Sequence, residues 1–162
     1  MMGKIIMLIG RISSGKTTYA RKVEREENAL RLSCDELMQI VFPEPMGDQY
    51  DMYARRCIQY LYRLGRQLAM GGANVVMDMG CWKRTERREA AEYFAGIEVD
   101  WRYLDIPEEE WKRRIASRNA AVLEGRSNMD EYLVDEGLLA KATAMFEAPT
   151  EDEGLKLTII RE

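Results

Sequence analysis

The segment from Gly10 to Thr17 constrains the fold of this chain more than any other part of the sequence. It reads Gly-Arg-Ile-Ser-Ser-Gly-Lys-Thr and satisfies the pattern G-x-x-x-x-G-K-[ST] at every fixed position. A continuous apolar run at 4–9 precedes it, and helical character begins at Gly15 and continues to Glu27. A buried strand, a glycine-rich turn and a helix in this order predict an α/β fold whose turn binds phosphate groups.

Strand and helix patterns alternate along the rest of the chain. Short apolar runs predict strands at 4–9, 29–32, 73–77, 99–104 and 157–160. Helical spacing of apolar residues predicts helices at 15–27, 33–41, 48–70, 85–94, 107–123 and 130–146. Ser33, with Glu36 three residues later, is the predicted N-terminal cap of the second helix. This alternation predicts a three-layer α/β P-loop NTPase fold with a mainly parallel five-stranded sheet, in a single domain spanning 1–162. Ligands bind beyond the carboxyl ends of such strands, so the residues that follow each strand are candidates for a site.

The phosphate-binding segment offers both backbone and side-chain groups to a nucleoside triphosphate. Its glycines allow a close approach that a side chain would block, so successive amides can point at phosphate oxygens. Lys16 is expected to place a mobile positive charge on the β- and γ-phosphates, and the Thr17 hydroxyl to bind Mg²⁺. The sequence therefore predicts ATP and Mg²⁺ as cofactors. The residues expected to contact the nucleotide are Gly10, Arg11, Ile12, Ser13, Ser14, Gly15, Lys16, Thr17 and Thr18.

Two carboxylates follow predicted strands. Asp35 comes after the second strand, where it could accept the proton of an attacking hydroxyl group of a substrate. Its alternative role is to stabilise the start of a helix, which acidic residues of a first turn often do. Asp78 ends an apolar strand, the position of an acid that holds Mg²⁺ or contacts substrate. The alternative for Asp78 is a solvated residue at a strand end.

Arginines cluster on a later helix, inside a predicted lid region at roughly 112–128. Arg114 and Arg118 are four residues apart and share one helix face. Their guanidinium groups could close over the triphosphate and neutralise negative charge during catalysis. The alternative is a solvated charged face, in which Glu110 and Arg114 form an ion pair along the helix.

A segment beginning at Trp82 joins an aromatic side chain to several basic ones, just beyond Asp78. Trp82 and Arg84 are candidate substrate contacts, since an aromatic face and a positive charge beside a catalytic loop can form a substrate wall. The same residues could instead form an exposed start of a helix.

Composition limits the remaining possibilities. The chain has 162 residues, a formal charge of −4 and no histidine, which leaves acid–base chemistry to Asp, Glu, Lys or Tyr. The negative charge does not favour a nucleic-acid partner. Three cysteines without C-x-x-C spacing are typical of reduced thiols, and no apolar run has the roughly 20 residues that a membrane helix needs. A cytoplasmic protein without a membrane partner is the expectation.

These motifs together resemble small bacterial P-loop proteins described as AAA-type ATP-binding proteins or kinases. That group is related to polynucleotide 5′-hydroxyl kinases, zeta toxins and chloramphenicol phosphotransferases. The resemblance covers nearly the whole chain. It implies that Asp35 is the general base, that Asp78 is a magnesium or substrate-side acid, and that the arginines belong to a lid. Beyond the phosphate loop it is carried by the segments 33–37, 78–82, 86–87, 104–107, 111–114, 118–119 and 146–154.

The expected activity is therefore an ATP-dependent phosphotransferase. It would move the γ-phosphoryl group of ATP to a hydroxyl acceptor, which is either a small molecule or a nucleic-acid end. A nucleotide-dependent switch or ATPase without a small-molecule acceptor is the alternative, and a module that binds nucleotide without turnover is a third reading. The resemblance does not name the acceptor, because members of such a fold differ in substrate.

Overall fold

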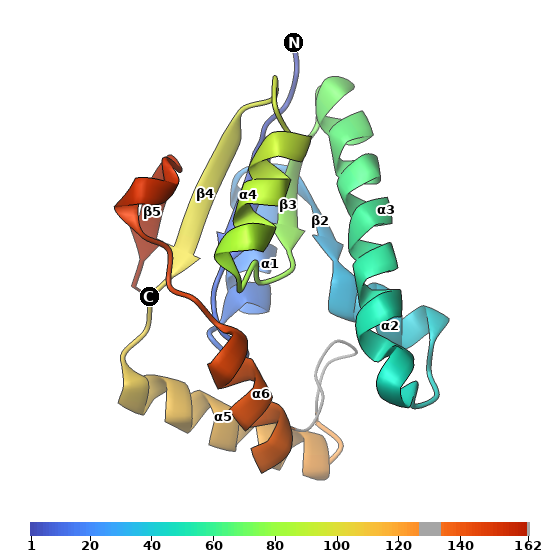
Figure 1. Ribbon diagram of the computed structural model, residues 1–162, viewed down its shortest axis with the longest axis vertical. Coiled ribbons are helices and arrows are strands. Elements are labelled where there is room, and N and C mark those ends of the chain that lie inside the picture. The colour runs from blue at the N-terminus through green and yellow to red at the C-terminus, as the bar shows by residue number, and fades with distance from the viewer. Residues whose placement is uncertain (127–133, 162) are drawn as a thin grey trace.

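The computed structural model describes residues 1–126 and 134–161. Its helices and strands alternate along the chain, as the sequence pattern predicts (Figure 1). The order is β1 (Ile5–Ile9), α1 (Lys16–Glu26), β2 (Ala29–Ser33), α2 (Cys34–Val41), η1 (Gly47–Gln49), α3 (Tyr50–Met70), β3 (Asn74–Asp78), α4 (Arg84–Tyr93), β4 (Val99–Leu104), α5 (Glu108–Leu123), α6 (Glu136–Met145), η2 (Glu151–Glu153) and β5 (Leu157–Ile160). No helix in the described ranges is both long and apolar enough to cross a membrane.

One parallel sheet holds all five strands in the order β2-β3-β1-β4-β5. Strand β1 lies at its centre, with Ile5 opposite Val75 of β3 on one side and Val99 of β4 on the other. All five residues of β1 are fully buried. A continuous apolar run without alternation is typical of a strand covered on both faces, so the predicted P-loop NTPase fold and its five-stranded sheet are confirmed.

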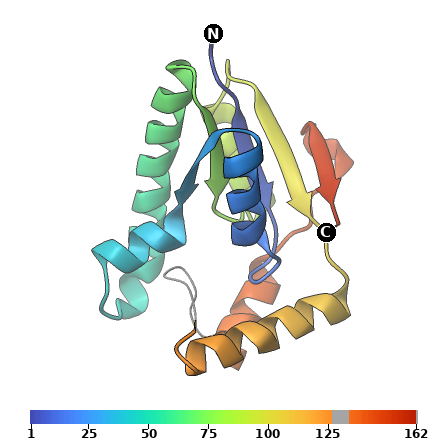
Figure 2. The ribbon, with the colours of Figure 1, turned by 180° about the vertical axis from the view of Figure 1, so that it is seen from behind.

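The two faces of the sheet pack against different helices. Ile6 and Leu8 face α1, where they join Ala20 and Val23 in one apolar cluster. The alternate side chains of β1 join a larger cluster on the opposite face, which also includes residues of α3 and α4. Opposite views show α1 on one side of the sheet and α4 on the other (Figure 1, Figure 2). The alternation of side chains along a strand therefore produces the three layers.

Helices α5 and α6 lie beyond the carboxyl ends of the strands rather than over a face of the sheet (Figure 1). A separate apolar cluster joins them to the phosphate loop through Ile12, Trp111, Ile115 and Ala142. The indole nitrogen of Trp111 donates a hydrogen bond to the backbone oxygen of Ile12 at 2.6 Å. This cluster holds α5 beside the edge of the sheet where ligands bind.

Some element boundaries differ from the sequence prediction. The helix predicted at 130–146 begins at Glu136, because the Asp135 carboxylate accepts a hydrogen bond from the Leu138 amide at 2.8 Å and caps the helix. Residues 130–133 of that prediction lie outside the described residues. The helix predicted from 48 onward starts as the short turn η1, and α3 follows it. The predicted cap of α2 is confirmed, since Ser33 accepts from the amide of Glu36 at 3.2 Å.

A buried ion pair fastens the segment after α6 to the rest of the molecule. The guanidinium group of Arg87 in α4 is fully buried and contacts both carboxylate oxygens of Glu153, at 2.7 and 3.1 Å. It also donates to the backbone oxygens of Cys81 and Trp82 at 2.9 and 3.2 Å. Next to this pair, the exposed Arg84 contacts Asp152 at 2.9 Å. The segment that leads to β5 is therefore anchored beside the loop that follows β3.

Candidate active site

The phosphate loop connects the end of β1 to the start of α1 and has the backbone geometry of an anion cradle. Gly15 adopts a φ of +93°, a conformation that strongly favours glycine. A β-carbon at Gly10 would lie 2.5 Å from the Ser14 hydroxyl, so only glycine fits there without a shift. The helix that starts at Lys16 directs its amides toward the loop, and its N-terminus favours a negatively charged ligand.

The hydroxyl group of Ser14 is a buried polar group of the loop. The residue is 1 % exposed, and within the described residues its hydroxyl has no hydrogen-bond partner. Buried hydroxyl groups are nearly always hydrogen-bonded, because an unsatisfied one costs about 1–3 kcal/mol. A phosphate oxygen in the loop would offer the missing acceptor. This feature fits a phosphate-bearing ligand.

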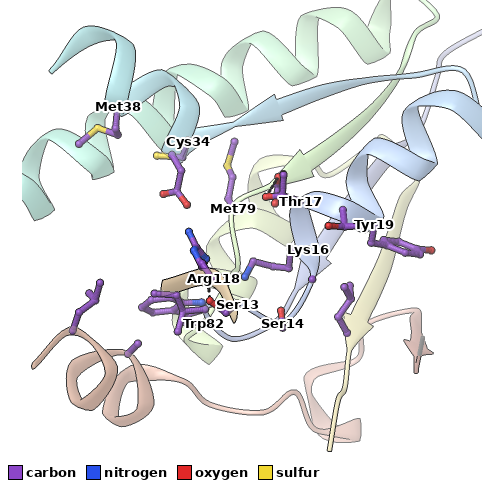
Figure 3. A pocket seen from close by; sticks show the side chains of 18 of the residues that line it. Ser13, Ser14, Lys16, Thr17, Tyr19, Cys34, Met38, Met79, Trp82 and Arg118 are labelled. Carbon is purple, nitrogen blue, oxygen red and sulfur yellow. Dashed lines mark hydrogen bonds between the residues drawn. The ribbon is translucent and has the colours of Figure 1, made fainter. Parts of the chain in front are cut away.

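Lys16 lies in the middle of the candidate site, where Figure 3 shows its side chain reaching into the cavity. Its ammonium group donates to the backbone oxygen of Arg11 at 2.7 Å. The surrounding protein lowers the pKa of Lys16 by desolvation, while the nearby carboxylates of Asp78 and Asp35 oppose that shift. A triphosphate would supply negative charge to the same group and stabilise its protonated form.

Thr17 and Asp78 meet at the other end of the loop. The Thr17 hydroxyl donates to a carboxylate oxygen of Asp78 at 3.0 Å, a contact between residues 61 positions apart in the chain. The same carboxylate oxygen accepts from Arg31 of β2, also at 3.0 Å. Arg31 contacts Glu36 at 2.6 Å as well, and its side chain is only 8 % exposed. Arg31 therefore fixes the position of Asp78 from the neighbouring strand.

The predicted arginines of α5 face the phosphate loop. Arg114 donates to the backbone oxygen of Ser14 at 2.8 Å, and Arg118 donates to the Ser13 hydroxyl at 3.0 Å. Arg114 also forms the ion pair along the helix, because its Nε lies 2.9 Å from a carboxylate oxygen of Glu110. One guanidinium group makes both contacts, so Arg114 forms the ion pair with Glu110 and also lies against the phosphate loop. Of the predicted lid region at 112–128, the residues 127 and 128 lie outside the described residues.

The other predicted contacts fall into two groups. Asp35 of α2 and Trp82 line the same cavity as the phosphate loop. The indole nitrogen of Trp82 donates to the backbone oxygen of Gly10 at 3.0 Å, which holds the ring against the loop. Arg84 is not among the residues that line the cavity, and its guanidinium group contacts Asp152 and Thr150 instead. The structure therefore separates Arg84 from the other predicted site residues.

A single large cavity, about 1370 Å³ in volume, joins these groups. Pockets for drug-sized ligands measure roughly 300–1,000 Å³, so this one has room for a nucleotide and a second molecule. Figure 3 shows Cys34, Met38 and Met79 across the cavity from Trp82 and Ser13. Thr18 lines it beside the first turn of α1, and Ile12, Ser13, Ser14, Gly15, Lys16, Thr17, Asp78, Arg114 and Arg118 line its phosphate end.

Two features in and around the cavity are absent from the sequence prediction. Arg31 is one, although a charged residue inside a strand expected to be buried is a signal that could have identified it. The other is an ion pair between Lys141 of α6 and Asp51 of α3, with contacts of 3.2 and 3.3 Å. Both residues line the cavity. Because 90 residues separate these two, no local pattern connects them.

Gly15 gives a test of the loop geometry. We expect Gly15→Ala to weaken ATP binding about tenfold, because alanine at a positive φ costs about 1–2 kcal/mol. The new β-carbon would also lie 2.5 Å from Nη1 of Arg114 and displace that side chain. Titration with a fluorescent ATP analogue measures the change. Gly96→Ala is the matched control, since Gly96 has a φ of +89° with no atom within 4 Å of the added carbon. Equal affinity of the Gly15 and Gly96 variants would contradict the role of the loop.

The cysteines beside the loop give a second test. Burial raises the pKa of Cys34 and of Cys81 to about 12. Both thiols therefore stay protonated at pH 8, and we expect iodoacetamide to modify them about a thousandfold more slowly than an ordinary thiol. The half-buried Cys57 should react first. Peptide mass spectrometry over time measures the order of labelling, and early modification of Cys81 in the folded protein would disagree with its burial.

Solved structures that resemble this fold include a sugar kinase, an APS kinase and Kti12. A sugar kinase from Janibacter sp. HTCC2649 has a TM-score of 0.61 and 22 % identity, over 98 % of this chain and 85 % of its own. An APS kinase from Mycobacterium tuberculosis, in complex with AMPPNP and APS, has a TM-score of 0.65 and 22 % identity over 99 % and 88 %. Kti12 from Chaetomium thermophilum, in complex with ADP-AlF3, has a TM-score of 0.71 and 18 % identity over 97 % and 88 %. At these identities the likeness shows the fold alone.

The sequence itself places the chain in a family. No curated protein matches it significantly. A family model described as an AAA domain, however, matches residues 5–149, which include the phosphate loop, both candidate carboxylates and the arginines of α5. The match confirms the resemblance to AAA-type P-loop proteins. The chain belongs to this AAA-domain family of P-loop proteins.

Proposed function

We propose that this chain is an ATP-dependent phosphotransferase that moves the γ-phosphoryl group of ATP to a hydroxyl acceptor. The observation that carries the proposal is the arrangement of one cavity. The phosphate loop with Lys16 lies at one end, and the Asp35 carboxylate lies on a wall of the same cavity. The fold is shared with a sugar kinase and an APS kinase, which supports phosphoryl transfer as the reaction. A structure of the same fold bound to AMPPNP supports ATP as the donor.

The groups around the loop have distinct roles in this proposal. Lys16 and the loop amides bind the β- and γ-phosphates, and the positive charges of Arg114 and Arg118 stabilise the transferring group. Mg²⁺ in such sites takes one or two protein oxygens together with phosphate oxygens and water. The oxygens of Thr17 and Asp78, 3.0 Å apart at the end of the loop, fit that role. Mg²⁺ would neutralise negative charge on the phosphates.

Asp35 is the proposed general base. The hydroxyl oxygen of the acceptor attacks the γ-phosphorus, and the hydroxyl proton moves to the Asp35 carboxylate. The negative charge of Asp35 also acts to raise the pKa of Lys16, which indicates that the Asp35 carboxylate lies near the phosphate end of the cavity. A base at this position needs an acceptor that enters the cavity between α2 and the loop after β3.

Substitution of Asp35 tests the proposal. With Mg²⁺ and a panel of nucleosides, sugars, antibiotics and 5′-hydroxyl oligonucleotides, the protein should consume ATP only when a hydroxyl acceptor is present. Asp35→Ala should lower kcat about a hundredfold and leave nucleotide affinity nearly unchanged, because the residue acts on the acceptor proton. Asp48→Ala, an exposed aspartate in the turn before α3, is the control. Phosphoryl transfer at the normal rate by the Asp35 variant would exclude Asp35 as the general base. ATP hydrolysis that does not depend on any acceptor would favour the alternative function, a nucleotide-dependent switch or ATPase.

A further inference from the structure

The end of the cavity remote from α1 has mostly apolar walls. Here we call this part the acceptor chamber. Its side chains come from α2 and its C-terminal end, from α3, from the loop after β3 and from α6, so four separate segments build it. Such walls remove apolar surface of a ligand from water, at roughly 25 cal/mol per Å². The apolar and aromatic residues that define the chamber are Met38, Phe42, Tyr50, Met79, Trp82 and Met145.

The chamber is placed to present a ligand to the phosphate loop. Figure 3 shows Met38 and Met79 on one side of the cavity, Trp82 on the other, and Lys16 and Arg118 between them. Because the indole nitrogen of Trp82 donates a hydrogen bond to the Gly10 backbone oxygen at 3.0 Å, the aromatic wall is fixed beside the phosphate loop. An apolar body held against this ring would therefore lie next to the transferring group.

The charged side chains of the chamber are mainly acidic. Asp35, Asp51 and Glu86 line it, and Lys141 and Arg118 are the cations of the described residues that lie against the same walls. The Lys141 ammonium is already engaged, because it contacts both carboxylate oxygens of Asp51 at 3.2 and 3.3 Å. Arg118 points to the phosphate loop, where it bonds to Ser13. A negatively charged group in the chamber would thus face three carboxylates, while the two neighbouring cations already contact Asp51 and Ser13.

We propose that the acceptor is a small alcohol with an apolar body and no negative charge, either uncharged or cationic at neutral pH. The proposal rests on the proposed function, since it names the substrate class of that same transfer. The acceptor oxygen forms a bond to the γ-phosphorus, the bond from that phosphorus to the β–γ bridging oxygen breaks, and ADP leaves. The acceptor proton moves to the Asp35 carboxylate. Carboxylated or phosphorylated alcohols are disfavoured because like charges repel in a cavity of low dielectric constant.

A series of three ligands with one skeleton tests this class. The probes are 4-(hydroxymethyl)benzamide, 4-(hydroxymethyl)benzylamine and 4-(hydroxymethyl)benzoate, which differ chiefly in charge. Their affinities for the full chain, saturated with AMPPNP and Mg²⁺, are measured by ligand-observed NMR titration. We expect the amide and the amine to bind at least about tenfold more tightly than the benzoate. Glu86→Gln should narrow this difference, whereas Glu89→Gln, an exposed carboxylate on the same helix, should leave it unchanged.

The outcomes separate this proposal from the proposed function. Equal affinities, a preference for the benzoate or no binding of any probe would overturn the acceptor class, and none of these results depends on phosphoryl transfer. If the amide binds but ATP is hydrolysed without formation of a phosphate ester on any alcohol, the proposed function fails and the acceptor role of the chamber fails with it. Preferential binding of the uncharged and cationic probes, together with their phosphorylation, supports both.

Discussion

Replacement of Lys16 by alanine is expected to lower kcat for ATP turnover about a thousandfold, the largest effect on activity that the structure predicts. The side chain is half-buried in the cavity, and its ammonium lies 2.7 Å from the Arg11 carbonyl at the mouth of the loop. In the proposed reaction this charge binds the β- and γ-phosphates and offsets the negative charge that shifts during transfer. Alanine provides no charge in its place, so transition-state stabilisation is lost more than ground-state binding.

Single-turnover measurements with ATP, together with titrations of AMPPNP, separate these two effects for Lys16→Ala. The expected result is a large fall in the rate of the chemical step with a smaller loss of affinity. Lys112→Ala is the control, since Lys112 is a largely exposed lysine on α5. If Lys16→Ala turned over ATP at the rate of the Lys112 variant, the loop would not be the site of chemistry.

Replacement of Glu153 by alanine is expected to lower the free energy of unfolding by about 3–5 kcal/mol. The substitution leaves the Arg87 guanidinium buried without its carboxylate partner, and Arg87 is fully buried in the interior. An unpaired charge in that position is far more costly than a lost surface contact. For a chain of this size the loss corresponds to a fall in Tm of roughly 10 °C.

The neighbouring Asp152 provides a matched control for this prediction. Asp152→Ala removes the contact with Arg84, a pair that joins the same two segments but lies exposed to solvent. Water and salt screen exposed ion pairs, so the Tm of this variant should stay close to that of the parent protein. Thermal unfolding followed by circular dichroism compares the two. Equal shifts for the Glu153 and Asp152 variants would show that burial of the Arg87 pair does not govern its contribution.

Short sequence motifs predict those parts of the site that are formed by residues close together in the chain. Residues 10–17 form the loop through their own backbone preferences. The location of Asp78 is predictable because this residue ends an apolar strand. The parallel sheet follows from continuous apolar runs such as β1, since both faces of such a strand must be covered. The predicted cap at Ser33 depends on contacts within four residues and is likewise correct.

Sequence patterns do not predict the contacts between segments that are far apart in the chain. The Lys141–Asp51 pair joins residues 90 positions apart, and the pairing of Arg84 with Asp152 joins residues 68 apart. Each charged residue by itself is compatible with a solvated surface, so only the tertiary arrangement assigns its partner. The start of α6 at Glu136 differs from the sequence prediction for another reason. The helical spacing of apolar residues continues on the N-terminal side of Asp135. The helix nevertheless begins after Asp135, because the cap at this residue overrides the periodicity.

Phosphorus NMR of the reaction mixture tests the central claim most directly. The protein, ATP, Mg²⁺ and an uncharged alcohol acceptor are combined, and the phosphorus signals are followed over time. Phosphoryl transfer predicts that the γ-phosphate signal of ATP decays while a phosphate monoester signal grows in equal amount, and that both changes nearly stop with Asp35→Ala. Growth of inorganic phosphate alone, at the same rate with and without any acceptor from the panel, would contradict the account.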